Sequence, residues 1–512
     1  MLAVLALAVA SCQPLAKTGL AAERPASDRP PNLVLIMCDD MGYSSIGCYG
    51  GEIQTPHLDK LAAEGLRFTQ FYNNAKCTTT RASLVTGLYP RRGKGGLLRN
   101  NMVTLGEALK LAGYNTALSG KWHLGSDEGA HPFRRGFDEY YGLLDGCCNF
   151  FCPTQRDPPF KGGRIRTFGE NDRKITEFPD DYYTTDAFTD HAIACVKKFS
   201  KEDKPFLLHV CYTAPHYPLH ARPEDIEKYV GTYKRIGWEE LRKQRHKRQI
   251  EMGLIDPKWE LPPMENEVIP WDVAPHKDWQ DLRMAVYAAM IDSMDQNIGR
   301  LLAALEETGE RENTLILFLS DNGGCSEKPG GNDPRQIPGP KEYYAHCGPG
   351  WACAQNTPFR RYKSCTHEGG VATPLIAHWP GRIPPRGMTR DVAHIIDVMP
   401  TFLELAGGEY PKEHAGQGIL PCEGKSMVPL LLGKQRESHE FLFWEWAGNR
   451  AVRSGDWKAC WDNRRKQWEL YNLPEDRTEM NDLADEQPDR TKRLAGAWTA
   501  WAKRTELGVG SG

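Results

Sequence analysis

Long hydrophobic runs are almost missing from this chain of 512 residues. The single one, from Leu2 to Ala10, is too short to cross a bilayer as a helix, so we expect no transmembrane span. An excess of either charge is also missing, because 64 Lys and Arg residues balance 67 Asp and Glu residues. This balance argues against a protein held on nucleic acid or on a membrane by bulk charge, so any anion recognition must be local.

Cysteine is sparse as well, and 15 residues in the whole chain are too few for a disulfide-built scaffold. The densest group is Cys147, Cys148 and Cys152. No second cysteine pair or histidine doublet stands at zinc-finger spacing, so we expect a local disulfide or buried thiols there rather than zinc. Internal repeats and low-complexity tracts are missing too, so function must come from specific sites.

The apolar run at the start of the chain is followed by a polar, proline-containing segment up to Pro31, which is typical of an export signal. Within it, Val9-Ala10-Ser11-Cys12 resembles a bacterial lipobox, which would make Cys12 a lipid-carrying N-terminus. The alternative is a cleaved signal with an incidental cysteine. Either interpretation predicts an exported protein that is periplasmic, extracellular or an outer-membrane lipoprotein.

Strand-length apolar runs at Asn32 to Met37 and Thr314 to Leu319 indicate buried parallel strands. Helical patterns lie between them, including Leu105 to Ala112 and the face from Tyr287 to Leu305. The alternation predicts an α/β fold with a sheet covered on both faces.

The predicted division is an export signal and linker at 1–30, a catalytic domain at 31–430 and a small C-terminal α+β domain at 431–512. In the last part, Ala451 to Trp461 and Gln467 to Leu473 indicate a small antiparallel sheet, followed by a terminal helix. Residues 229–280 look like an insertion beside the site. The basic run from Arg242 to Arg248 inside it is either a solvated helix face or a patch for a polyanion.

Acidic and amide side chains follow both predicted strands: Asp39 and Asp40 end the first, and Asp321 and Asn322 end the second. Carboxyl ends of strands converge on the ligand crevice of open α/β sheets, so these four side chains could meet. Three carboxylates and one amide oxygen form a cage for a hard cation, Ca²⁺ or Mg²⁺ rather than zinc. Taken singly, an Asp pair after a strand is usually a loop or helix cap.

A second constellation is Cys77-Thr78-Thr79-Thr80-Arg81, which continues to Thr86-Gly87. If Cys77 opens a helix, Arg81 lies one turn further on the same face, and the helix N-terminus adds positive potential. The nucleophile Cys77 and the anion-binding Arg81 would then lie next to each other.

These residues resemble the formylglycine-dependent sulfatases of the alkaline-phosphatase superfamily, in the arylsulfatase-like branch. Cys77, Arg81, Thr86 and Gly87 match that family's signature, whereas Thr79 replaces its usual Pro or Ala and bears on how efficiently the maturation enzyme oxidises Cys77. The resemblance continues, in the family's order, through Gly120-Lys121-Trp122-His123-Leu124-Gly125, Thr213-Ala214-Pro215-His216, and Lys363 ahead of His367-Glu368-Gly369-Gly370.

The resemblance implies a large, mostly parallel sheet, a formylglycine formed from Cys77 by a maturation enzyme, and a calcium ion, with magnesium second. The ion would be held by Asp39, Asp40, Asp321, Asn322 and the modified Cys77. The hydrated aldehyde would attack sulfur, oriented by Arg81, while Asp321 accepts its proton. Lys121 and Lys363 would hold the sulfate, His216 would protonate the leaving oxygen, and His123 would deprotonate the second hydroxyl so that sulfate is expelled.

The expected substrate is an aryl sulfate or a sulfated carbohydrate, selected by segments such as 140–180 and 229–280. Two alternatives stay open: a phosphonate monoester or phosphodiester hydrolase of the same superfamily, and an unmodified protein that binds sulfated glycans. His220 and His367 either line the entrance or merely pack, and we leave them outside the catalytic set.

Overall fold

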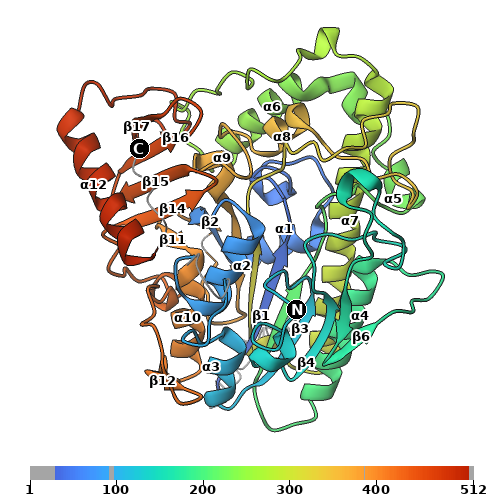
Figure 1. Cartoon of the computed structure of the whole chain (residues 1–512), viewed down its shortest axis with the longest axis vertical. Coiled ribbons are helices and arrows are strands. Elements are labelled where there is room, and N and C mark those ends of the chain that lie inside the picture. Colours follow the sequence, from blue (N-terminus) through green and yellow to red (C-terminus); the bar gives the residue numbers. More distant parts are fainter. Residues whose placement is uncertain (1–28, 91–96, 386, 507–512) are drawn as a thin grey trace, which may run out of the picture.

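The computed structural model describes residues 29–90, 97–385 and 387–506, so the predicted export signal and Cys12 lie outside the described residues. In this part of the chain, eleven strands form one central sheet (Figure 1). Its strands are β1 (Asn32–Cys38), β2 (Leu66–Tyr72), β3 (Asn115–Gly120), β4 (Glu139–Leu143), β5 (Phe168–Glu170), β6 (Arg173–Ile175), β7 (Phe206–Cys211), β8 (Thr314–Ser320), β9 (Ala372–His378), β10 (Gly387–Thr389) and β11 (Ala393–His394).

The strand order is β10-β2-β9-β8-β1-β7-β3-β4-β5-β6, and β11 also pairs with β2. The centre of the sheet, β8-β1-β7-β3-β4, is parallel, and β9 is antiparallel to both of its neighbours. The two predicted strands are confirmed as β1 and β8, with Cys38 in register with Ser320. The carboxyl ends of β1 and β8 therefore lie side by side.

Successive side chains of β1 point to opposite faces of the sheet, as the period of a strand requires. Val34 and Ile36 join one apolar core, and Leu33, Leu35 and Met37 join another. Both faces of the sheet are therefore covered, which confirms the predicted α/β fold.

Two sets of helices cover the two faces (Figure 1). Helices α1, α4 and α7 contribute to the first core, and α2, α3 and α10 contribute to the second. The bounds are α1 (Pro56–Glu64), α2 (Cys77–Thr86), α3 (Leu105–Leu111), α4 (Thr184–Phe199), α5 (Pro223–Glu227), α6 (Thr232–Glu251), α7 (Lys277–Glu307), α8 (Pro349–Gln355), α9 (Glu368–Val371), α10 (Val398–Leu405), α11 (Val428–Leu431) and α12 (Pro488–Arg504).

Helix α7 begins ten residues before the predicted Tyr287 because its first turns are held by polar contacts. Asp281 accepts hydrogen bonds of 2.7 Å from the backbone N–H groups of Gly231 and Lys234. Arg283 donates from Nη2 to Nδ1 of His346 over 3.1 Å. Polar contacts of this kind leave no apolar periodicity in the sequence.

The C-terminal part contains a four-stranded antiparallel sheet of β14 (Leu442–Trp446), β15 (Asn449–Ser454), β16 (Trp457–Asp462) and β17 (Gln467–Asn472). Helix α12 packs on this sheet through Trp498 and Trp501 (Figure 1). The predicted run from Ala451 to Trp461 is a hairpin rather than one strand, because Gly455 adopts a positive φ of 56° between β15 and β16. A separate pair, β12 (Glu413–His414) and β13 (Gln417–Gly418), lies outside both larger sheets.

The segment 229–280 contains α6, a short 3-10 turn at Trp271–Val273 and the first residues of α7, and α6 packs on α7 and α8. Its basic run is only in part a solvated face. Arg245 is fully buried and donates from Nη2 to Glu52 Oε1 over 2.7 Å, and Arg242 donates to the carbonyl oxygen of Pro262 over 2.8 Å. Across the residues that the structure describes, no helix combines the length and apolarity needed to cross a membrane.

Candidate active site

The side chains after β1 and β8 meet above the carboxyl edge of the sheet. Asn322 donates from Nδ2 to Oδ1 of Asp40 over 2.7 Å, and the backbone N–H of Asp40 donates to Oδ1 of Asp321 over 3.2 Å. Asp39 is fully buried in the same group. These four residues converge, as the sequence predicts. The hydrogen bonds between the two strand ends join residues that are 279 or more positions apart along the chain.

This oxygen-rich group has the donor set of a hard-cation site. Potential ligand atoms of Asp39, Cys77 and Asp321 lie within 4.8 Å of one another, as do those of Asp39, Asp40 and His216. Two buried oxygens, Oδ1 of Asp39 and Oδ1 of Asn322, have no hydrogen-bond partner among the described residues. Unpartnered buried oxygens fit a cation with oxygen ligands. The residues present therefore fit the metal that the sequence predicts.

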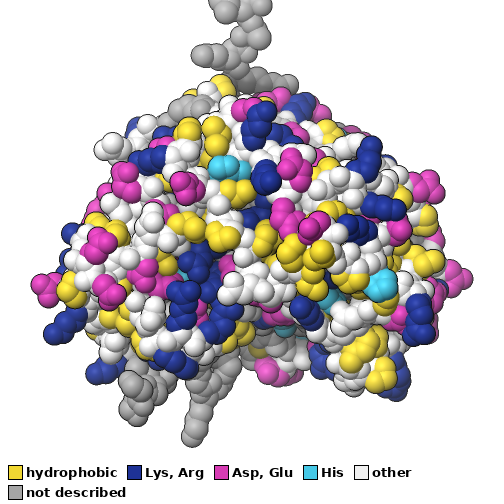
Figure 2. All heavy atoms as spheres, turned by 90° about the horizontal axis from the view of Figure 1, so that it is seen from above, with side chains coloured by type: hydrophobic (Ala, Val, Ile, Leu, Met, Phe, Trp, Pro, Cys, Tyr) yellow, Lys and Arg dark blue, Asp and Glu magenta, His cyan; other side chains and the backbone are white. Residues whose placement is uncertain are grey.

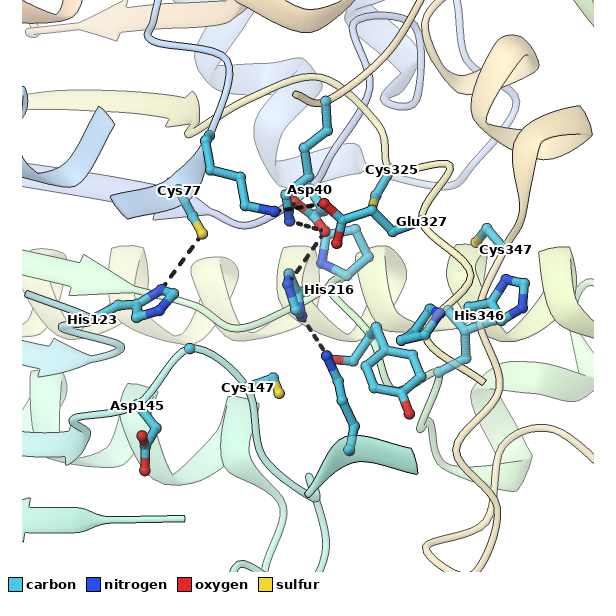
Figure 3. Close-up of a pocket in the computed structure, with 18 of the residues that line it drawn as sticks. Asp40, Cys77, His123, Asp145, Cys147, His216, Cys325, Glu327, His346 and Cys347 are labelled. Atoms are coloured by element: carbon cyan, nitrogen blue, oxygen red, sulfur yellow. Dashed lines mark hydrogen bonds and ion pairs between the residues drawn. The ribbon is translucent and has the colours of Figure 1, made fainter. Parts of the chain in front are cut away.

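Cys77 is the first residue of α2 and is only 2% exposed. Its Sγ lies 3.5 Å from Nδ1 of His123 (Figure 3). The helix ends at Gly87, whose φ of 67° gives the left-handed cap that glycine favours. Thr79 is buried and donates to the carbonyl oxygens of Asn74 and Lys76 over 3.0 and 2.9 Å, so the residue that departs from the sulfatase signature holds the start of α2.

Three buried cations surround the acidic group. Arg81 donates from Nη2 to Asp321 Oδ2 over 3.1 Å and from Nη1 to the carbonyl oxygen of Lys121 over 2.9 Å. Lys121 itself pairs with Asp39. Lys363, in the loop before α9, lies 2.6 Å from Asp40 Oδ1. Each predicted sulfate-holding side chain is therefore brought to the same place.

The charges of this group shift its pKa values in opposite directions. Burial raises the pKa of Asp39, but Lys121 and neighbouring cations outweigh it and hold that pKa well below its usual range. Burial and the charge of Asp39 raise the pKa of Asp321 to about 7. Burial lowers the pKa of Lys363, but Asp40 more than offsets it, so the ammonium stays charged.

The two predicted catalytic histidines contact different members of the site, His123 contacting Cys77 and His216 contacting Asp40. His123 follows β3 with a positive φ of 59°, and burial, followed by Lys121 and Arg81, lowers its pKa well below the usual value. Nε2 of His216 lies 3.4 Å from Asp40 Oδ2, and Nδ1 lies 2.6 Å from the carbonyl oxygen of Tyr217. Burial lowers the pKa of His216 to about 4 although Asp40 opposes it.

A cavity of about 240 Å³ opens onto these residues (Figure 3). Asp40, Cys77, His123, His216 and Lys363 line it, which joins the predicted nucleophile, histidines and cation in one hollow. The rest of the wall lies outside the predicted site set: Lys76, Asp145, Gly146, Cys147, Lys161, Arg164, Arg166, Pro215, Tyr217, Leu219, Tyr287, Cys325, Glu327, Pro329, His346, Cys347 and Gln355.

Of the two segments predicted to select the substrate, only 140–180 lines this cavity. No residue of 229–280 is among the described residues of its wall. Gly146 is essential to the wall's shape, since a Cβ there would overlap Cε1 and Nε2 of His123. Loop contacts of this kind leave no periodic signal in a sequence.

The two histidines left outside the catalytic set are packing residues. His220 is fully buried, accepts from the backbone N–H of Phe150 over 3.3 Å and lies 3.2 Å from the carbonyl oxygen of Tyr343. His367 pairs with Glu469 of β17 over 2.7 Å. Neither lines the cavity.

The next residue of that motif, Glu368, joins the two parts of the chain. Lys458 of β16 donates to Glu368 Oε1 over 2.8 Å and to Glu479 Oε1 over 2.9 Å, and Arg477 donates to Glu368 Oε2 over 2.8 Å. All of these side chains are buried. The motif therefore anchors the C-terminal sheet beside the loop that carries Lys363.

The cysteines that the structure describes form no disulfide. Within the described ranges, all fourteen are free thiols. Of the two predicted alternatives, a local disulfide or buried thiols, Cys147 and Cys148 are therefore buried thiols. Neither belongs to a group with metal-ligand spacing.

Comparison with known proteins defines the class to which this fold and site belong. Residues 31–408 match the sulfatase family model, and residues 361–495 match the model of the C-terminal region of N-sulphoglucosamine sulphohydrolase. The chain belongs to the sulfatase family of the alkaline-phosphatase-like superfamily, and it is a sulfuric ester hydrolase.

Similar proteins span most of the chain. An uncharacterised sulfatase of Schizosaccharomyces pombe is 31% identical over 95% of this chain and 96% of its own length. The arylsulfatase of Klebsiella aerogenes is 32% identical over 80% of this chain and 94% of its own. The crystal structure of Ps i-CgsB in complex with k-i-k-neocarrahexaose is 26% identical, covers 93% of both chains and superimposes with a TM-score of 0.68.

Proposed function

We propose that this sulfatase acts through a formylglycine formed from Cys77 and a divalent cation, Ca²⁺ rather than Mg²⁺, held by Asp39, Asp40, Asp321 and Asn322. The observation that carries the proposal is the pair of unpartnered buried oxygens, Asp39 Oδ1 and Asn322 Oδ1, together with the position of Asp39 within metal-ligand spacing of Cys77 and Asp321. A buried acceptor without a partner costs free energy, and a cation bound by oxygen would relieve both. Modified Cys77 would complete the ligand set.

The cation and the modified Cys77 would supply two elements of chemistry. The cation would act as a Lewis acid beside the sulfate, and the hydrated aldehyde would supply a hydroxyl nucleophile. The chain supplies the positive surroundings that a sulfate ester needs as charge develops on its leaving oxygen. In this proposal, Arg81 orients the nucleophile, while Lys121 and Lys363 bind the sulfate oxygens.

Three side chains are proposed to move protons. Asp321 would accept the proton of the attacking hydroxyl, and His123 would accept that of the second hydroxyl, since its Nδ1 already contacts Cys77 Sγ at 3.5 Å. Nδ1 of His216 is positioned to donate to the carbonyl oxygen of Tyr217, which leaves Nε2 to carry the proton for the leaving oxygen. The negative charge of a bound ester favours that protonated form.

For the substrate class we propose a sulfated carbohydrate. The support is the structural similarity to Ps i-CgsB, which was crystallised with k-i-k-neocarrahexaose. The proposal includes export through the N-terminal segment, a formylglycine-generating enzyme as a maturation partner, and Cys12 as the lipid anchor if the lipobox-like sequence is used.

The test is turnover of nitrophenyl sulfate beside nitrophenyl phenylphosphonate, with and without a calcium chelator. We expect sulfate hydrolysis that the chelator abolishes and added Ca²⁺ restores, and no sulfate hydrolysis by Cys77→Ala. Comparable or faster turnover of the phosphonate would favour the superfamily alternative. Binding of sulfated glycans without any turnover by the modified protein would favour the binding protein.

A further inference from the structure

One wall of the cavity carries a cation that the proposed chemistry does not use. Lys161, Arg164 and Arg166 come from one short segment of the chain, and all three line the cavity. Arg164 pairs with Asp145, and Nε of Arg166 donates to Asp157 Oδ2 over 2.6 Å. These pairs neutralise two of the three charges.

The other lining cations are also paired. Lys76 lies 2.6 Å from Glu327 Oε1, and Lys363 lies 2.6 Å from Asp40 Oδ1. Within the described ranges, Lys161 alone among the cavity's lysines and arginines has no carboxylate within ion-pair distance. Its ammonium therefore adds net positive charge to the wall.

The position of Lys161 is set by its surroundings. Its Nζ lies 5.1 Å from the centroid of the Tyr217 ring, which is within the range of a cation–π contact. Its backbone is held by a short turn from Pro159 to Lys161, in which the N–H of Lys161 donates to the carbonyl oxygen of Pro158 over 2.8 Å. The ammonium is thus directed over a ring of the cavity wall rather than into bulk solvent.

The ring that supports Lys161 adjoins the proposed acid for the leaving group. Tyr217 follows His216, the residue proposed to protonate the leaving oxygen, and both line the cavity. Figure 3 shows His216 between the pair of Cys77 and His123 on one side and His346 and Cys347 on the other. An ester attacked at the Cys77 end could extend its alcohol part past His216, and the neighbouring Tyr217 lines the same cavity.

We propose that Lys161, supported by the ring of Tyr217, binds a second anionic group, a sulfate or a carboxylate, on the alcohol part of the substrate. The inference rests on the proposed function and narrows its substrate class to sulfated saccharides that carry a further negative charge. An unpaired ammonium in a partly enclosed cavity attracts an anion more strongly than one in open solvent.

The test uses sulfonates, which resemble sulfate esters but are not hydrolysed. Calorimetric titration with Ca²⁺ present compares benzenesulfonate with its meta-carboxy and para-carboxy derivatives. We expect one of the carboxylated probes to bind about tenfold more tightly to the wild type, an advantage that shrinks as salt rises. Lys161→Met removes this preference and Lys161→Arg retains it.

The matched control is Lys174→Met, an exposed lysine outside the cavity wall, which keeps the wild-type preference. Equal affinities of the wild type for all three probes, or an undiminished preference in Lys161→Met, would overturn the inference. Its failure is separate from that of the proposed function, because turnover of nitrophenyl sulfate measures the latter and the sulfonates need no turnover.

Discussion

Asn322 at the end of β8 donates from Nδ2 to Oδ1 of Asp40 at the end of β1 over 2.7 Å. This bond fixes the orientation of the amide and leaves its oxygen without a partner in the buried group. Asp39 of the same buried group has an unpartnered oxygen of its own. A cation bound there would link two strands that are distant along the chain.

Calcium should consequently stabilise the fold. A ligand that binds only the folded protein at a hundred times its Kd adds about 2.7 kcal/mol to the free energy of unfolding. Asp39→Asn removes one negative charge from the site while keeping its shape, and we expect at least about a tenfold loss of Ca²⁺ affinity. Urea unfolding at rising Ca²⁺ concentrations measures both effects. Stability that is independent of Ca²⁺ would contradict the metal site.

Arg81→Lys should lower kcat/KM for an aryl sulfate about a hundredfold. A lysine keeps the charge but has one nitrogen, so it cannot reach both the carbonyl oxygen of Lys121 and Asp321 as the guanidinium does. Steady-state kinetics of the calcium-loaded, modified enzyme measure the loss. Arg493→Lys, on the exposed face of α12, is the control and should behave as wild type.

Gly146→Ala should reduce kcat by more than about tenfold with little loss of folding. The added methyl group would overlap the imidazole of His123 and move it from its place 3.5 Å from Cys77. The control is Gly496→Ala in α12, where a Cβ meets no atom within 4 Å. Unchanged kinetics of Gly146→Ala would mean that the position of His123 is not critical.

Glu368→Gln should make the protein less sensitive to acid. Burial opposes ionisation of Glu368, but Lys458 and Arg477 outweigh it and lower its pKa from 4.5 to about 2. Because the pKa in the folded state is lowered, the stabilisation is complete above pH 4.5 and is lost as the pH falls toward 2. The shift corresponds to about 3 kcal/mol at neutral pH.

Urea unfolding of wild type and Glu368→Gln between pH 7 and pH 3 checks this prediction. The two stabilities should differ at neutral pH and approach each other below pH 4.5. A difference that stays constant with pH would show that Glu368 acts through shape alone and not through its charge.

The strand ends of the site could be predicted from the sequence because buried strands are continuous apolar runs that stop at polar residues. Asp39, Asp40, Asp321 and Asn322 were placed in this way, whereas Lys121, His216 and Lys363 were placed through the resemblance to sulfatases. Gly146 and Lys161 were missed because their contacts depend on how a loop folds back onto the sheet.

The segment 229–280 is a second case in which the sequence alone did not predict the contacts of its side chains. It was predicted to help select the substrate, but Arg242 and Arg245 are used for internal contacts, and α6 packs on α7 and α8. Charge along a sequence does not tell whether its partner is solvent, a ligand or a buried carboxylate such as Glu52.

The most direct test of the account is the mass of the tryptic peptide Cys77–Arg81 from the protein produced with a formylglycine-generating enzyme. The account predicts the mass of an aldehyde at position 77 in place of the thiol, in the same preparation that hydrolyses nitrophenyl sulfate in a chelator-sensitive reaction. An unmodified thiol in a preparation that still hydrolyses the ester would contradict it.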